Sequence, residues 1–220
     1  MLHPNTKLRP VSAEIGMGVI AARPIPRGTL IWVVCDRERI CTPAQAAELS
    51  PADREAIEHH GYVDALGNYV LCCDEGRYVN HACVSTTLPL GMEVEIAVRD
   101  VAPGDHITCE YSTLNLLGAL RCRCGLPSCR GLVRGSDILR YWPAWDRLIR
   151  DAVECAGSVP QPLLRFARDR ANVEAIIEGL VEVPSVRACL FPNLVHAHVP
   201  EVLPASPLWP LRDPGPEGTP

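Results

Sequence analysis

The sequence predicts a mainly β protein with short helices, an α+β fold. Up to about Glu110, short apolar runs alternate with turns that contain Pro or Gly, which is typical of short strands. After Ser136 the apolar residues instead recur with helical spacing. At 220 residues the chain is long enough for one hydrophobic core with small additions.

The first strand pair is expected between Ile15 and Val34, where two apolar runs flank a turn rich in Pro and Gly. Two short helices are expected within 41–60, because Thr42 and Ser50 each place an N-cap hydroxyl before a proline. Four more strands are expected, at 62–63, 69–73, 94–99 and 106–110.

The C-terminal part is expected to be helical and then extended. Apolar positions within 137–153 and 163–180 are spaced for one helical face, and we expect them to pack against the rest of the protein. These positions are also consistent with a substrate groove or a dimer contact. From Val183 to Pro220 recurring prolines predict an extended segment, disordered toward its end. The residues able to hold it to the body are Leu203, Leu208, Trp209 and Leu211.

Composition excludes several classes of protein. A net charge of -5 and a pI near 5.8 argue against sequence-independent nucleic-acid binding. A basic protein partner fits better, although so small a charge is usually only a feature of a soluble surface. Neither a signal peptide nor a membrane-spanning stretch is recognisable, so we expect a cytoplasmic protein, or a nuclear one in a eukaryote.

Eleven cysteines are many for a chain expected in a reducing compartment, where thiols more often bind metal than form disulfides. Cys122, Cys124 and Cys129 surround a Gly-Leu-Pro turn, which predicts that all three reach one ion. Structural zinc takes four ligands, and Cys83 beside His81 is the best candidate for the fourth. The others are expected in the core or as surface bystanders: Cys35, Cys41, Cys72, Cys73, Cys155 and Cys189.

Three further sequence clusters carry candidate ligand-binding groups. Gly16-Met17-Gly18 lets the backbone approach a ligand closely. The run Arg77-Tyr78-Val79-Asn80-His81-Ala82-Cys83 offers several hydrogen-bonding groups, and Gly104 to Tyr111 ends on a phenol. Taken singly, each of these clusters is more often structural.

The order of the clusters changes that interpretation. Gly-x-Gly, then Arg-Tyr-Val-Asn-His-Ala-Cys, then Gly-Asp-His-Ile-Thr-Cys-Glu-Tyr, then Cys-x-Cys-Gly-x3-Cys-Arg-Gly resembles the SET-domain lysine methyltransferases with a cysteine-rich post-SET segment. The resemblance covers about residues 14 to 135. It implies small curved β-sheets with a pseudo-knot, a zinc-binding post-SET loop and a C-terminal helical appendage. The implied divisions are 14–115 (SET, with a helical insert at 41–60), 116–135 (post-SET), 136–182 (helical) and 183–220 (Pro-rich).

The resemblance also implies residue roles. Tyr111 matches the catalytic tyrosine, which would align the ε-amine of a lysine with the methyl group of S-adenosylmethionine. Cys83, Cys122, Cys124 and Cys129 would hold one structural Zn²⁺. The implied cofactor-binding residues are Gly16, Met17, Gly18, Arg77, Tyr78, Asn80 and His81. The implied partner is a lysine-containing protein, with neither membrane nor direct nucleic-acid binding expected.

Two departures from the family pattern are visible. Cys109 occupies the position where the family usually has an aromatic residue that limits the number of methyl groups, which suggests room for more than one. Ser85-Thr86 replaces the usual Pro-Asn and puts the local turn in doubt. Two alternatives stay open: a catalytically inactive SET-like module that binds a partner through its zinc-stabilised surface, and a zinc-storage or redox-responsive protein.

Overall fold

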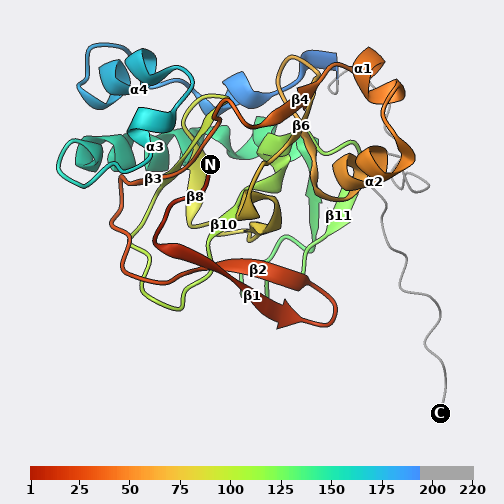
Figure 1. Cartoon of the computed structure of the whole chain (residues 1–220). Coiled ribbons are helices and arrows are strands. Elements are labelled where there is room, and N and C mark those ends of the chain that lie inside the picture. The colour runs from red at the N-terminus through yellow and green to blue at the C-terminus, as the bar shows by residue number, and fades with distance from the viewer. Residues whose placement is uncertain (194–220) are drawn as a thin grey trace.

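The structure is a computed structural model that describes residues 1–193 (Figure 1). The residues expected to hold the extended segment, Leu203, Leu208, Trp209 and Leu211, lie outside the described residues. Within the described part, short strands form small separate sheets and only a few helices are present. The predicted α+β fold class is therefore confirmed.

Two of the small sheets are three-stranded. One has the order β3 (Leu30–Val33), β9 (Val94–Ala97), β8 (Thr87–Pro89), and the other has the order β4 (Arg39–Cys41), β6 (Tyr69–Leu71), β5 (Tyr62–Val63). All their pairings are antiparallel. The other sheets are β1 (Thr6–Ser12) with β2 (Gly16–Ala21), β7 (Asn80–His81) with β10 (Thr108–Cys109), and β11 (Ala119–Arg121) with β12 (Leu132–Arg134).

The helical insert forms as predicted from its caps. α1 (Pro43–Ala47) begins after Thr42, whose side chain forms a capping box with Gln45. α2 (Pro51–His60) begins after Ser50, whose hydroxyl accepts a hydrogen bond from the Asp53 amide. In Figure 1 both helices lie on the opposite side of the molecule from α3 and α4.

The long helix α3 (Ile138–Ala156) completes the largest hydrophobic core. Its residues Trp145, Ile149 and Val153 pack in one buried cluster with Leu30 of β3 and Ile96 of β9. The expectation that hydrophobic positions after Ser136 pack against the β-rich body is therefore confirmed. No helix among residues 1–193 is long and apolar enough to cross a bilayer.

The region 163–180 contains less helix than its periodicity predicts. A 3-10 turn at Leu164–Phe166 is followed by the separate helix α4 (Arg170–Ile177). The break arises because the Asp169 side chain caps a new helix by accepting a hydrogen bond from the Asn172 amide. Positive φ at Gly179 lies just beyond the end of α4.

Strands β1, β4, β8, β11 and β12 were not among the strands expected from the sequence, and the start of the predicted extended segment also differs. β1 was not expected, because Lys7, Arg9 and Pro10 interrupt its apolar pattern; it pairs with β2 along its length and remains largely exposed. The start of the predicted extended segment forms a 3-10 turn, Val186–Cys189, and buries both of its end residues in the core. Three other 3-10 segments are Glu75–Tyr78, Tyr111–Leu114 and Gly135–Asp137.

Candidate active site and metal centre

A cavity of about 440 Å³ opens between the small sheets, a volume suited to a small organic ligand. Its walls come from segments that are distant in sequence: β2, the turn that precedes β7, β9 and the end of β10. Seven of the residues singled out from the sequence line it, namely Gly16, Met17, Arg77, Tyr78, Asn80, Cys109 and Tyr111.

Gly18 and Asn80 explain how the Gly-x-Gly segment joins the second cluster. The Asn80 side-chain amide donates a hydrogen bond to the Met17 carbonyl over 2.9 Å. A Cβ atom on Gly18 would lie 2.8 Å from the Asn80 side-chain nitrogen and 2.6 Å from Val11. Gly18 therefore does not line the cavity, but its lack of a side chain allows Asn80 to reach β2.

The parallel pairing of β7 with β10 brings the second and third clusters together. Asn80 lies opposite Thr108, and His81 lies opposite Cys109. Tyr111 follows directly, and its hydroxyl donates to the Val79 carbonyl over 2.9 Å. Burial raises the pKa of Tyr111, so its hydroxyl stays protonated at neutral pH and is suited to orient a ligand.

His81, like Gly18, is an implied cofactor-binding residue that does not line the cavity. Its side chain is 4% exposed. Its Nδ1 lies 3.3 Å from the backbone nitrogen of Tyr111, which donates to it, and its Nε2 lies 3.6 Å from the Cys83 sulfur. Burial and the nearby Arg130 lower the pKa of His81 to about 4, so the ring is neutral near pH 7. The ring lies between the Tyr111 backbone and the Cys83 sulfur.

The four predicted cysteine ligands meet at one point. The sulfur atoms of Cys83, Cys122, Cys124 and Cys129 lie within 4.8 Å of one another, and the first two are 3.6 Å apart. Four thiolates bound to zinc at about 2.3 Å in a tetrahedron would be separated by about 3.8 Å. The donor set and its spacing therefore fit a closed structural zinc site.

Backbone geometry brings Cys122, Cys124 and Cys129 back to Cys83. Gly125 and Gly131 adopt positive φ angles of 71° and 72°, so the chain turns sharply on either side of Cys129. Desolvation raises the pKa of the Cys124 thiol, but hydrogen bonds from backbone amides and neighbouring thiols outweigh it and lower that pKa to about 7. The Arg130 and Gly131 amides donate to the sulfurs of Cys83 and Cys129 over 3.3 and 3.4 Å. Such donors favour thiolates.

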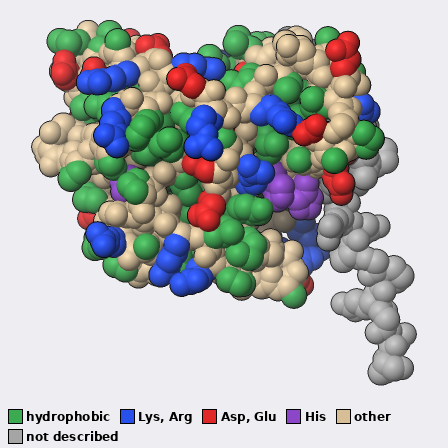
Figure 2. All heavy atoms as spheres, in the orientation of Figure 1, with side chains coloured by type: hydrophobic (Ala, Val, Ile, Leu, Met, Phe, Trp, Pro, Cys, Tyr) green, Lys and Arg blue, Asp and Glu red, His purple; other side chains and the backbone are tan. Residues whose placement is uncertain are grey.

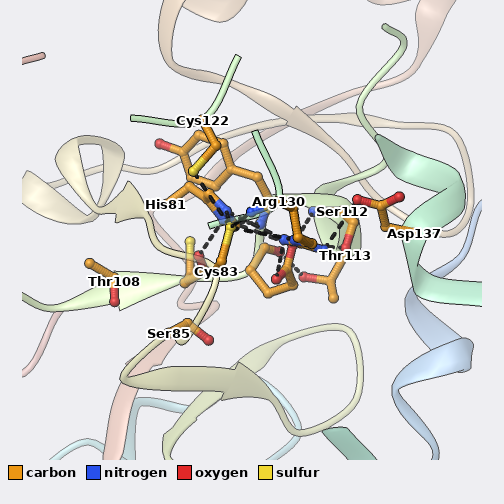
Figure 3. Close-up of polar contacts among 12 residues, drawn as sticks. His81, Cys83, Ser85, Thr108, Ser112, Thr113, Cys122, Arg130 and Asp137 are labelled. Atoms are coloured by element: carbon orange, nitrogen blue, oxygen red, sulfur yellow. Dashed lines mark hydrogen bonds and ion pairs between the residues drawn. The ribbon is translucent and has the colours of Figure 1, made fainter. Parts of the chain in front are cut away.

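An ion pair that sequence reasoning missed links this cluster to the cavity. Arg130 donates to both carboxylate oxygens of Glu110 over 2.7 Å, and the Glu110 side chain is 1% exposed. The same guanidinium donates to the Cys83 sulfur and to Asp137, and lies over Tyr141 of α3. Figure 3 shows Arg130 at the centre of these contacts, with His81 and Cys83 beside it. The only sequence signal was that both charges stand inside motifs, next to Cys129 and Tyr111.

A second group of sulfur and carboxylate atoms lies at Cys35, Glu38 and Cys73. The Glu38 carboxylate accepts hydrogen bonds from the Cys73 amide over 2.6 Å and from the Met1 amino group over 2.8 Å. The two thiols lie 3.9 Å apart beside it. These groups thus satisfy one another within the protein and need no ion.

Charged side chains of both signs are exposed on one face of the molecule. On the face shown in Figure 2, basic and acidic side chains are interspersed, and no continuous basic stripe crosses it.

Comparison with known proteins identifies one part of the chain. The family model described as SET domain matches residues 16–112, a range that includes β2, the Asn80–His81 strand and Tyr111. A comparison with curated proteins finds no match. The cysteines at 122, 124 and 129 lie just beyond the matched range.

Proposed function

We propose that this chain, whose residues 16–112 match the SET-domain model, is a methyltransferase that transfers methyl groups from S-adenosylmethionine to the ε-amine of a lysine in a protein substrate. One observation carries the proposal. Gly16–Met17, Arg77–Asn80 and Tyr111 come from separate parts of the SET match, yet they line a single cavity. A degenerate domain that serves only as a binding module has no reason to keep all three.

When bound, S-adenosylmethionine would supply an electrophilic methyl group, because the sulfur that carries this methyl group is positively charged. The protein's own task is therefore to position and desolvate the two reactants. Met17, Arg77 and Asn80 would hold the donor along one wall. Tyr111, protonated and fixed by Val79, would align the reacting groups.

We also propose that Cys83, Cys122, Cys124 and Cys129 hold one structural zinc ion. All four ligands are thiols, so a tetrahedral ion there would keep no position for a substrate, and its role would be mechanical. Cys83 lies two residues after His81 of β7, and the other ligands lie in the loop between β11 and β12. The ion would tie that loop to the strand beside the cavity.

A methyl-transfer assay tests the proposed function. Purified full-length protein is incubated with radiolabelled S-adenosylmethionine and a mixture of basic proteins, and the labelled amino acid is identified after hydrolysis. Label on methylated lysine supports the proposal. Absence of both transfer and S-adenosylhomocysteine binding would reject the methyltransferase and favour the inactive module, which needs only its zinc-stabilised surface to bind a partner.

Replacing Tyr111 by Phe is expected to lower kcat by about 10- to 1000-fold while changing the affinity for S-adenosylhomocysteine by no more than about twofold. The hydroxyl acts at the reacting centre and contributes little to binding of the donor. Turnover and calorimetric binding are measured on the same preparation. Tyr69→Phe, outside the cavity lining, is the matched control; equal activity of both variants would remove Tyr111 from the mechanism.

Replacing Cys109 by Tyr is expected to shift the products toward monomethyl-lysine. Cys109 is buried, lines the cavity and stands two residues before Tyr111, so a larger ring there would occupy the space of added methyl groups. Mass spectrometry of the modified lysine gives the product ratio, with Cys109→Ser as the control of similar size. An unchanged ratio in the Tyr variant would show that another side chain limits the space.

A further inference from the structure

A carboxyl group lies inside the cavity at a position where the sheet would normally place an apolar side chain. β9 is the central strand of its sheet, and Val94 and Ile96 point into the core shared with α3. Because side chains alternate along a strand, Glu95 points to the other face. There it lines the cavity together with Cys109 and Tyr111.

A hydrogen bond from the Thr87 side chain positions Glu95. The Thr87 hydroxyl, itself 1% exposed on β8, donates to one oxygen of Glu95 over 2.6 Å. Within residues 1–193, Glu95 forms no ion pair, whereas Glu110 has Arg130. A fixed acid that faces a cavity without a cation of its own is suited to receive one from a ligand.

The surroundings of Glu95 make this charge costly. Burial, and then the charge of Glu110, raise the pKa of Glu95 to about 7, although the Thr87 hydrogen bond opposes the shift. Among residues 1–193, the other titratable side chains that interact with Glu95 are Tyr62, Cys109 and Cys189, and burial raises the pKa of each, so they stay neutral. Near neutral pH, Glu95 therefore exchanges readily between acid and carboxylate.

We propose that Glu95 receives the ε-ammonium group of the substrate lysine and accepts its proton, leaving the neutral amine required for methyl transfer. In this step one N–H bond breaks, its electron pair stays on nitrogen, and an O–H bond forms on the carboxylate. The acid returns its proton to water after the product leaves. This inference rests on the proposed function and specifies its substrate class. The substrate is a cationic amine, selected by a carboxylate in the wall of the cavity.

Desolvation alone would serve the reaction less well. An apolar channel favours a neutral amine but also repels the ammonium form, which predominates in water because the lysine pKa is about 10.4. A carboxylate attracts the ammonium form and then removes its charge by taking the proton. Because Thr87 fixes one oxygen, the second oxygen is left to face the incoming nitrogen.

The first test measures ammonium binding at Glu95 without using turnover. The full-length protein is labelled with ¹³C at the glutamate carboxyl carbons, and the Glu95 resonance is assigned by its loss in Glu95→Gln. Its titration is followed alone, with n-butylammonium, which reproduces the end of a lysine side chain, and with n-butanol. We expect n-butylammonium, and not n-butanol, to lower the pKa of Glu95. The same titration curve in all three conditions would overturn the proposal.

The second test measures the pH dependence of kcat/KM on the lysine substrate found in the transfer assay. In the wild type it should fall below about pH 7, where Glu95 becomes protonated. Glu95→Gln should lose about 100-fold near pH 7, keep its affinity for S-adenosylhomocysteine, and regain rate as pH rises toward the lysine pKa. In Glu95→Asp, kcat/KM should still fall as the pH drops below neutral, but its maximum should be lower than in the wild type. An unaltered profile in Glu95→Gln would refute proton acceptance.

Two controls separate the possible failures. Glu93→Gln changes a glutamate two residues away that pairs with Arg168 at the surface, and it should match the wild type in both tests. Glu95→Gln should also melt at a higher temperature than the wild type above about pH 7, because it removes a carboxylate whose charged form is desolvated in the folded protein. This shows that any lost activity is not lost folding. If the wild type methylates no lysine, the proposed function fails. The ¹³C titration of Glu95 still decides whether Glu95 binds n-butylammonium.

Discussion

Replacing Cys124 by Ser is expected to lower the free energy of unfolding and the affinity for S-adenosylhomocysteine together. Structural zinc contributes on the order of 10 kcal/mol to small domains that depend on it, so losing one of four ligands should cost several kcal/mol. The segment that the ion would hold has little core of its own, since Cys122, Cys124 and Cys129 are only partly buried and Leu132 is exposed. Without the ion, the loop would separate from β7 beside the cavity.

Metal analysis, thermal melting and calorimetric binding on one preparation check this expectation. The wild type should carry one zinc per chain, and Cys124→Ser less than one. Cys155→Ser, a partly buried cysteine of α3 outside the cluster, is the matched control and should behave as the wild type. Several loosely held metal ions per chain would favour the zinc-storage protein. An unchanged melting temperature in Cys124→Ser would contradict a structural role of the zinc ion.

The metal ligands were predictable because their signal is local. Cys122, Cys124 and Cys129 stand within eight residues, and Gly125 between them and Gly131 just after them permit the turns that the structure shows. Only Cys83 required a contact across the fold, and it was the best candidate because it stands beside His81. The helix caps at Thr42 and Ser50 were predictable for the same reason, since a cap is fixed by three or four neighbouring residues.

The charged partners were not predictable, because their pairing depends on tertiary contacts. Glu110 and Arg130 are twenty residues apart, and each resembles an ordinary surface charge until β10 and the cysteine loop bring them together. Glu95 stands within the run Val94–Ala97, where one acid in an apolar strand is usually assigned to a solvent-facing edge. Only the position of β9 between β3 and β8 shows that this face closes a cavity.

Replacing Arg130 by Met is expected to destabilise the fold by about 3–5 kcal/mol, because it leaves the buried carboxylate of Glu110 without its partner. Arg123→Met is the matched control: that arginine lies in the same loop but pairs with Glu14 at the surface, so its loss should cost at most about 1 kcal/mol. Denaturant unfolding of the full chain measures both values.

The loss in Arg130→Met should also depend on pH in a defined direction. Burial already raises the pKa of Glu110, and removing Arg130 takes away the opposing effect. Folded Glu110 then holds a proton that the unfolded chain releases above about pH 4.5, so the stability of the variant falls as pH rises through that window. Its deficit should be smaller near about pH 5 than near about pH 8, and adding Glu110→Gln should recover part of it. A deficit independent of pH and unrelieved by Glu110→Gln would mean that Arg130 acts through Cys83 and α3 instead of the buried ion pair.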